Sequence, residues 1–135
     1  MIVVDASVWA TALADPAESG DRSRAQLDRD AQWTAPSHMP TEVLQTLRRM
    51  EQAGRLTASE ATTLVGAVLR REVRYVKPRA WLLESQWQLR HTISAYDAAY
   101  IVLGRSFGVP LVTLDLRLAK AAATLGVEVR TVERD

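Results

Sequence analysis

Four acidic residues from distant parts of the chain stand where predicted helices begin: Asp5, Glu42, Asp97 and Asp115. Asp5 and Asp115 each follow a short apolar run typical of a buried strand, whereas Glu42 and Asp97 lie in the first turn of a helix. Capping alone could explain any one of them. Asp is a favoured N-cap, and a negative charge there gains about 0.3–1 kcal/mol from the helix dipole.

The four carboxylates together predict a metal-ion site. The carboxyl ends of parallel strands share one edge of a sheet, and ligand sites of open α/β sheets lie in the crevice there. Asp5 and Asp115 are therefore expected near one another, and Glu42 and Asp97 would add two charges if they project into the same crevice. Two unit charges ~4 Å apart repel by ~4 kcal/mol at an effective dielectric of ~20, which protons or a cation must relieve.

A divalent cation would relieve this repulsion and also do chemistry. Mg²⁺ and Mn²⁺ prefer hard oxygen ligands and keep several bound waters. One such water can be activated as a nucleophile while the metal stabilises charge on a phosphoryl oxygen. The expected reaction is metal-assisted hydrolysis of a phosphodiester.

Asp97 also lies on a helical stripe that is apolar or small, with Ile101, Gly104 and Gly108 at i+4, i+7 and i+11. A carboxylate on a stripe that faces the interior needs a partner, because an unpaired buried charge is expensive. We therefore expect Asp97 to point inward.

Short strands alternate with helices along the chain. Strands are predicted over residues 2–4, 32–35, 73–76, 111–114 and 127–132, and helices over 7–13, 22–30, 40–54, 57–69, 80–89, 98–104 and 116–125. Ala25 and Leu27 are the expected inner residues of the second helix, and Trp81, Leu82 and Trp87 are available to the core. This order indicates an α/β fold, a mostly parallel sheet covered by helices on both faces.

Length and composition fit one domain over residues 1–135, with 47% hydrophobic residues to fill its core. The absence of cysteine excludes a disulfide framework and a cysteine zinc site. No apolar run approaches the ~18 residues that span a bilayer, and no secretory signal is present, so we expect no membrane association and a cytoplasmic location. The net charge of +1 gives no argument for nucleic-acid binding.

The ordered motifs resemble those of PIN-domain nucleases and, more closely, of VapC-type toxins of toxin–antitoxin pairs. The matching stretches span nearly the whole chain: Ile2-Val-Val-Asp5-Ala-Ser7, Ala35-Pro-Ser-His-Met-Pro-Thr-Glu42-Val, Ser94-Ala-Tyr-Asp97-Ala-Ala-Tyr-Ile and Leu111-Val-Thr113-Leu-Asp115-Leu-Arg-Leu-Ala. The resemblance implies a three-layer α/β/α sandwich with a five-stranded parallel sheet.

The same resemblance implies an endoribonuclease dependent on Mg²⁺ or Mn²⁺ that acts as a toxin on RNA. It assigns the catalytic and metal-binding positions to Asp5, Glu42, Asp97 and Asp115, with Thr113 and Ser7 as polar support. It further implies a homodimer and a VapB-type antitoxin that wraps the helices of residues 43–69, forming a heterotetramer or a larger assembly.

Two other interpretations stay open on the sequence. The same sheet edge could serve another carboxylate–metal phosphohydrolase or a receiver-like phosphoacceptor, although a receiver wants several acids after its first strand. The chain could also be a non-catalytic interaction module whose acids are only helix caps. The basic stretch of residues 70–79 is interpreted as a solvated face, with an RNA track as the alternative.

Overall fold

Five parallel strands form one sheet in the computed structural model, which describes residues 1–133; the last two positions of the predicted 1–135 domain lie outside the described residues. The strand order across the sheet is β3-β2-β1-β4-β5. The strands are β1 (Ile2–Val4), β2 (Trp33–Pro36), β3 (Arg74–Val76), β4 (Leu111–Thr113) and β5 (Val129–Thr131).

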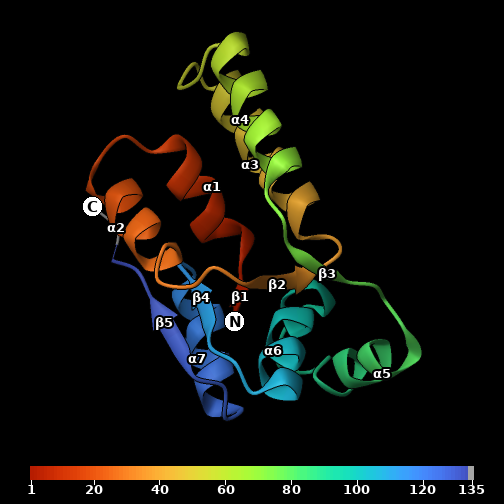
Figure 1. Cartoon of the computed structure of the whole chain (residues 1–135). Coiled ribbons are helices and arrows are strands. Elements are labelled where there is room, and N and C mark those ends of the chain that lie inside the picture. Colours follow the sequence, from red (N-terminus) through yellow and green to blue (C-terminus); the bar gives the residue numbers. More distant parts are fainter. Residues whose placement is uncertain (134–135) are drawn as a thin grey trace.

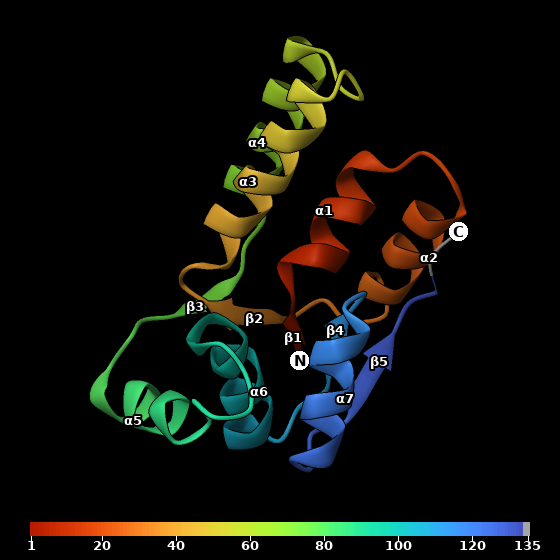
Figure 2. The same cartoon turned by 180° about the vertical axis from the view of Figure 1, so that it is seen from behind.

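Helices connect and cover the strands on both faces of the sheet (Figures 1 and 2). They are α1 (Ala6–Ala14), α2 (Glu18–Leu27), α3 (Met39–Gln52), α4 (Ala58–Arg70), α5 (Ala80–Gln88), α6 (Ala95–Phe107) and α7 (Leu116–Thr124). Right-handed crossovers on this strand order put α1 and α2 on one face and α6 and α7 on the other. The predicted three-layer α/β/α fold is confirmed.

The centre of the molecule is apolar because the middle strand is buried on both faces. Ile2, Val3 and Val4 have no exposed surface, and Tyr100 and Ile101 of α6 are equally buried against them. Val3 pairs with Leu111 of β4. This arrangement brings the carboxyl ends of β1 and β4 together, which fixes where the loops after them can place a side chain.

The helix pair α3–α4 extends away from the sheet as a hairpin (Figures 1 and 2). A capping box opens α4, in which Thr57 Oγ1 accepts from the Glu60 amide at 3.1 Å and Glu60 Oε1 accepts from the Thr57 amide at 2.9 Å. Thr57 and Glu60 stand three positions apart at the start of the helix predicted over residues 57–69, which is the spacing of a capping box. None of the helices within residues 1–133 combines the length and apolar character needed to cross a membrane.

Two predictions for the second helix are wrong, namely its first residue and one of its two inner residues. The helix α2 begins at Glu18 rather than at residue 22, and Ala25 is exposed although Leu27 is buried. Apart from Leu27, the buried residues of α2 are small (Ser19, Gly20 and Ser23). The helix approaches the preceding loop closely, because a Cβ on Gly20 would lie 1.8 Å from the carbonyl oxygen of Asp15. Hydrophobic spacing cannot detect such a face.

The tryptophans of α5 do not enter the core. Leu82 is 2% exposed, whereas Trp81 is 41% and Trp87 64% exposed. The helix packs against α6, and Leu82 is the buried residue of this helix. Trp81 meets Phe107 of α6 edge-on at the rim of this contact, with ring centroids 6.5 Å apart, and Trp87 stays exposed.

Candidate active site

Asp5 lies in a polar pocket at the carboxyl ends of β1 and β4. Its side chain accepts hydrogen bonds at Oδ2 from the hydroxyls of Thr113 at 2.7 Å and Ser7 at 2.5 Å. Asp5 is only 7% exposed and Thr113 is fully buried. Burial raises the pKa of the Asp5 carboxyl, while the two hydroxyl donors oppose that rise.

The hydroxyls of Ser7 and Thr113 also join the two strand ends. Ser7 Oγ accepts from the Leu114 amide at 3.2 Å, and Thr113 Oγ1 accepts from the Asp115 amide at 2.9 Å. Each hydroxyl thus donates to Asp5 and accepts from the loop after β4. The two hydroxyls therefore hold the backbone around Asp115 at a fixed position relative to Asp5.

Asp115 is the N-cap of α7. One oxygen, Oδ1, accepts from the amides of Arg117 at 3.0 Å and Leu118 at 3.1 Å. The capping role considered from the sequence is therefore real for this residue. A carboxylate offers about four lone-pair positions on its two oxygens, so capping through Oδ1 leaves the other oxygen available.

Asp97 lies in the first turn of α6, a helix that Ser94 caps by accepting from the Asp97 amide at 3.1 Å. Its side chain is 22% exposed and lies 3.8 Å from the guanidinium of Arg117. Burial and then the negative charge of Asp115 raise the pKa of Asp97, and Arg117 lowers it. The inward direction predicted for Asp97 agrees with its partly buried position.

Glu42 lies in the first turn of α3. Pro40 occupies the same turn, where an amide N–H would have no partner within the helix, so its lack of one costs nothing. The hydroxyl of Tyr100 donates to Glu42 Oε1 at 2.7 Å, and the imidazole Nε2 of His38 lies 3.5 Å from the same oxygen. Burial raises the pKa of Glu42, the Tyr100 hydrogen bond lowers it, and the charge of Asp97 raises it.

Repulsion links the four acids, which we call the acidic quartet: Asp5, Glu42, Asp97 and Asp115. Glu42 and Asp97 both raise the pKa of Asp5, and Asp115 raises that of Asp97. The fold therefore gathers four predicted side chains from separate elements at one edge. Across residues 1–133, however, no three His, Cys, Asp or Glu side chains are arranged to hold a metal ion.

A family model for the PIN domain matches residues 2–124. The chain belongs to the PIN domain family. It is also 39% identical over 124 residues to Ribonuclease VapC3 of Mycobacterium tuberculosis, a match that covers 89% of this chain and 86% of that protein. This similarity places the PIN domain within the VapC group, as the sequence motifs suggested.

Solved structures of VapC proteins share the fold. The crystal structure of Mycobacterium tuberculosis VapC20, described as a Sarcin-Ricin loop cleaving toxin, matches with a TM-score of 0.70 at 22% identity and covers 90% of this chain and 95% of that one. The structure of VapBC2 from Rickettsia felis, bound to a DNA fragment from its promoter, matches with a TM-score of 0.71 at 12% identity and covers 98% and 100% of the two chains.

Two hollows of this PIN domain share Ser7 and Leu114 in their linings, and one of them reaches Asp115 of the acidic quartet. One, of about 740 Å³, is lined by Asp115, Leu116 and Arg117 and by the residues after β5. The other, of about 560 Å³, is lined by polar and apolar residues of α1, α3 and the loops after them, among them Thr11, Thr46, Met50 and Arg55.

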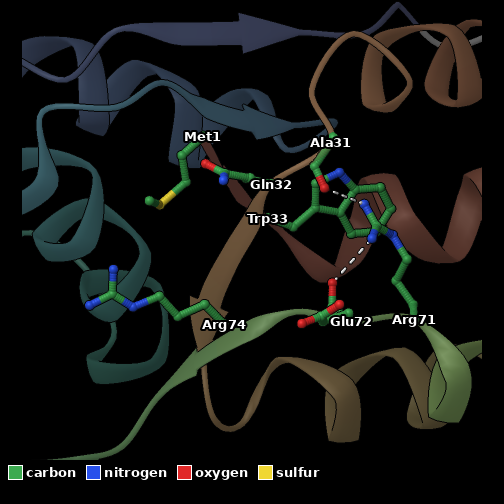
Figure 3. Close-up of a pocket in the computed structure, with 7 residues that line it drawn as sticks. All are labelled: Met1, Ala31, Gln32, Trp33, Arg71, Glu72 and Arg74. Atoms are coloured by element: carbon green, nitrogen blue, oxygen red, sulfur yellow. Dashed lines mark hydrogen bonds between the residues drawn. The ribbon is translucent and has the colours of Figure 1, made fainter.

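A third hollow, of about 400 Å³, lies at the opposite edge of the sheet, where the strands begin (Figure 3). Arg71 stacks 3.8 Å above the ring of Trp33 and donates to the carbonyl oxygens of Ala31 and Glu72, each at 3.1 Å. Arg74 lines the same hollow. These arginines of the basic stretch are therefore remote from the acidic quartet and have structural partners.

The sequence missed three residues at the candidate site: Tyr100, His38 and Arg117. Tyr100 is fully buried, and burial followed by the charges of Asp5 and Glu42 raises its pKa well above the ordinary value, so its hydroxyl stays a donor. His38 lies four residues before Glu42, and burial lowers its pKa. For His38 and Tyr100 the available signal was helical spacing from Glu42 and from Asp97, which is equally typical of packing. Arg117 had no such signal.

Proposed function

We propose that this PIN domain is a divalent-metal-dependent endoribonuclease that acts as the toxin of a toxin–antitoxin pair. The observation that carries the proposal is the acidic quartet, in which the buried carboxylate of Asp5 repels two other acids. The relatives named as VapC ribonucleases support an RNA substrate. The similarity to VapC3 covers 89% of the chain, and the PIN-domain match over residues 2–124 includes all four acids.

The donor set fits Mg²⁺ or Mn²⁺ because every ligand on offer is a hard oxygen. Asp5, Asp97 and Asp115 would hold the ion directly or through water, and Glu42 would complete the shell or orient the attacking water. Water ligands are consistent with the lack of three pre-arranged acids within residues 1–133. The bound ion would supply an activated water and stabilise charge on the phosphoryl oxygen.

Ser7 and Thr113 would keep Asp5 in one orientation before the ion arrives. Both hydroxyls donate to the same oxygen, Oδ2, which leaves Oδ1 of Asp5 available. Such outer contacts orient ligands and tune the affinity of metal sites. The quartet and its two supporting hydroxyls together are the proposed catalytic machinery.

We further propose a VapB-type antitoxin as the protein partner, by analogy with the VapBC2 structure from Rickettsia felis. An apolar hollow of about 430 Å³ lies between α3 and α4, lined in part by Leu44, Leu47 and Val65. Apart from Thr41, its lining residues fall within the predicted antitoxin-binding segment 43–69. A homodimer, a heterotetramer with antitoxin and a cytoplasmic location stay predictions.

The test is cleavage of a structured RNA by the purified protein with Mg²⁺ or Mn²⁺, followed by addition of EDTA. We expect cleavage that EDTA abolishes, and a loss of at least about 100-fold in Asp5→Asn and Asp97→Asn. Asp28→Asn is the matched control, because Asp28 is an exposed acid after α2. Full activity in both site variants would refute the assignment, and cleavage that survives EDTA would refute metal dependence.

A further inference from the structure

Tyr100 is a polar side chain in the middle of the apolar helix α6. Its neighbours Ala99, Ile101 and Val102 are buried and apolar, and Tyr100 itself has no exposed surface. A buried tyrosine hydroxyl almost always needs a hydrogen-bond partner. Phenylalanine would fill the same space without that requirement, so the partners of the hydroxyl are the feature to explain.

The Tyr100 hydroxyl joins two segments that approach the site from different directions. It donates to Glu42 Oε1 at 2.7 Å, across 58 positions of sequence, and the backbone of Ala6, the residue after Asp5, lies close enough to lower its pKa. One hydroxyl thus contacts the first turn of α3 and lies near the junction between β1 and α1. These two segments carry Glu42 and Asp5.

Glu42 has few other constraints in the described structure. Its side chain is 37% exposed, and the only other polar contact recorded for it is His38 Nε2 at 3.5 Å. That distance is too long for a good hydrogen bond, and His38 Nε2 is buried without a hydrogen-bond partner in the described residues. The Tyr100 hydroxyl is therefore the contact that limits the rotamers of Glu42.

We propose that Tyr100 is a positioning residue that fixes Glu42 against the Asp5 segment, so that one Glu42 oxygen is held and the other faces a cation or its water. This inference rests on the proposed function, because it gives Glu42 a role toward the metal ion. A glutamate without the tether would sample several rotamers and hold the ion less well. The tyrosine itself touches neither substrate nor metal.

The first test is Tyr100→Phe, which removes the hydroxyl and keeps the ring. Calorimetric titration with Mn²⁺ should show affinity reduced about 10-fold, within the range of about 10–100-fold found for residues that orient metal ligands. The matched control is Thr34→Val, which removes another fully buried hydroxyl, one that donates to the Arg74 carbonyl at 2.8 Å away from the quartet. Its Mn²⁺ affinity should equal that of the wild type.

A double-mutant cycle separates positioning from general stability. In a Glu42→Ala background, Tyr100→Phe should cause no further loss of Mn²⁺ affinity or RNA cleavage, since its effect passes through Glu42. An equal loss in both backgrounds would overturn the inference. If Tyr100→Phe does not fold, Glu42→Asp breaks the same contact from the other side, and unchanged Mn²⁺ affinity there would also overturn it.

The outcomes also separate this inference from the proposed function. A wild type that binds Mn²⁺ and cleaves RNA, with a Tyr100→Phe variant that matches it in both, overturns the positioning role alone. A wild type that neither binds Mn²⁺ nor cleaves RNA overturns the proposed function, and the role of Tyr100 with it.

Discussion

At the scale of single residues, the most informative feature is a carboxylate that burial makes costly to ionise. Asp5 is 7% exposed, and its pKa is raised by burial and by its acidic neighbours despite two hydroxyl donors. A group of this kind is unfavourable for the metal-free fold at neutral pH. A bound cation would offset the cost of ionising Asp5. The effect of Asp5 on the melting temperature can therefore be measured independently of catalysis.

Asp5→Asn should raise the melting temperature of the metal-free protein at neutral pH. The folded-state pKa of Asp5 lies above its unfolded value of about 3.9, so its stabilising contribution is complete below the unfolded pKa and is lost as pH rises through the folded pKa. Asparagine does not ionise and avoids that loss. Each 1 kcal/mol recovered corresponds to about 3–5 °C for a chain of this size.

Thermal melts in EDTA across pH 4 to 8 would check this prediction. The advantage of Asp5→Asn should shrink toward acidic pH, where the wild-type carboxyl is protonated. Mn²⁺ should reverse the order by stabilising the wild type, by about 2.7 kcal/mol at 100 times its dissociation constant. A variant that melts lower than the wild type at every pH would favour a purely structural Asp5.

At the scale of elements, three helices carry an acid of the quartet at their N-terminus, and each N-terminus has its own local cause. Asp115 caps α7, Ser94 caps α6, and Pro40 lies in the first turn of α3. The end of α6 is also constrained, because a Cβ on Gly104 would lie 2.8 Å from Val127 Cγ1. The glycine lets α6 approach the segment before β5, and Asp97 stands on the same stripe of that helix.

Two substitutions at Asp115 separate capping from chemistry. Asparagine caps a helix about as well as aspartate, whereas alanine costs about 1 kcal/mol. Asp115→Asn should therefore unfold at nearly the wild-type denaturant concentration, Asp115→Ala should unfold earlier, and both should lose RNA cleavage. Denaturant titration and the cleavage assay together decide the matter, and an active Asp115→Asn variant would mean that the residue only caps α7.

At the scale of the whole molecule, positive charge is divided between opposite edges of the sheet. Arg117 lies beside Asp97 and is 84% exposed at the candidate site, whereas Arg71 and Arg74 line the hollow where the strands begin (Figure 3). This division favours the solvated-face interpretation for these two arginines. Lys77 and Arg79 follow the carboxyl end of β3 and stay candidates for RNA contact.

Arg117→Ala should weaken RNA binding, while Arg74→Ala should leave it unchanged. A side chain that pairs with one phosphate adds about one unit to the slope of log affinity against log salt. Binding by fluorescence anisotropy in an Asp5→Asn background, at several salt concentrations, would show a smaller slope for Arg117→Ala alone. Equal slopes in the two arginine variants would place the RNA elsewhere on the molecule.

The sequence by itself determined the elements and the edge at which the acids gather. Apolar runs, caps and helix stops are local signals, and the parallel topology that they predict brings the ends of β1 and β4 together. The family motifs added the five-stranded sheet and the order of the acids. Asp5 and Asp115 could therefore be expected near one another, and the structure links them through the Thr113 hydroxyl, which donates to Asp5 and accepts from the Asp115 amide.

Only the tertiary structure decided which side chains touch. Periodicity shows which face of a helix is buried and not what that face meets, so nothing in the sequence distinguishes Tyr100 from a packing residue. The structure places its hydroxyl 2.7 Å from Glu42 Oε1. For the same reason the sequence made Trp81 and Trp87 available to the core, whereas the structure leaves both exposed. Contacts across 58 or 108 positions, such as Tyr100 with Glu42 and Thr113 with Asp5, depend on how whole layers pack, which no local pattern encodes.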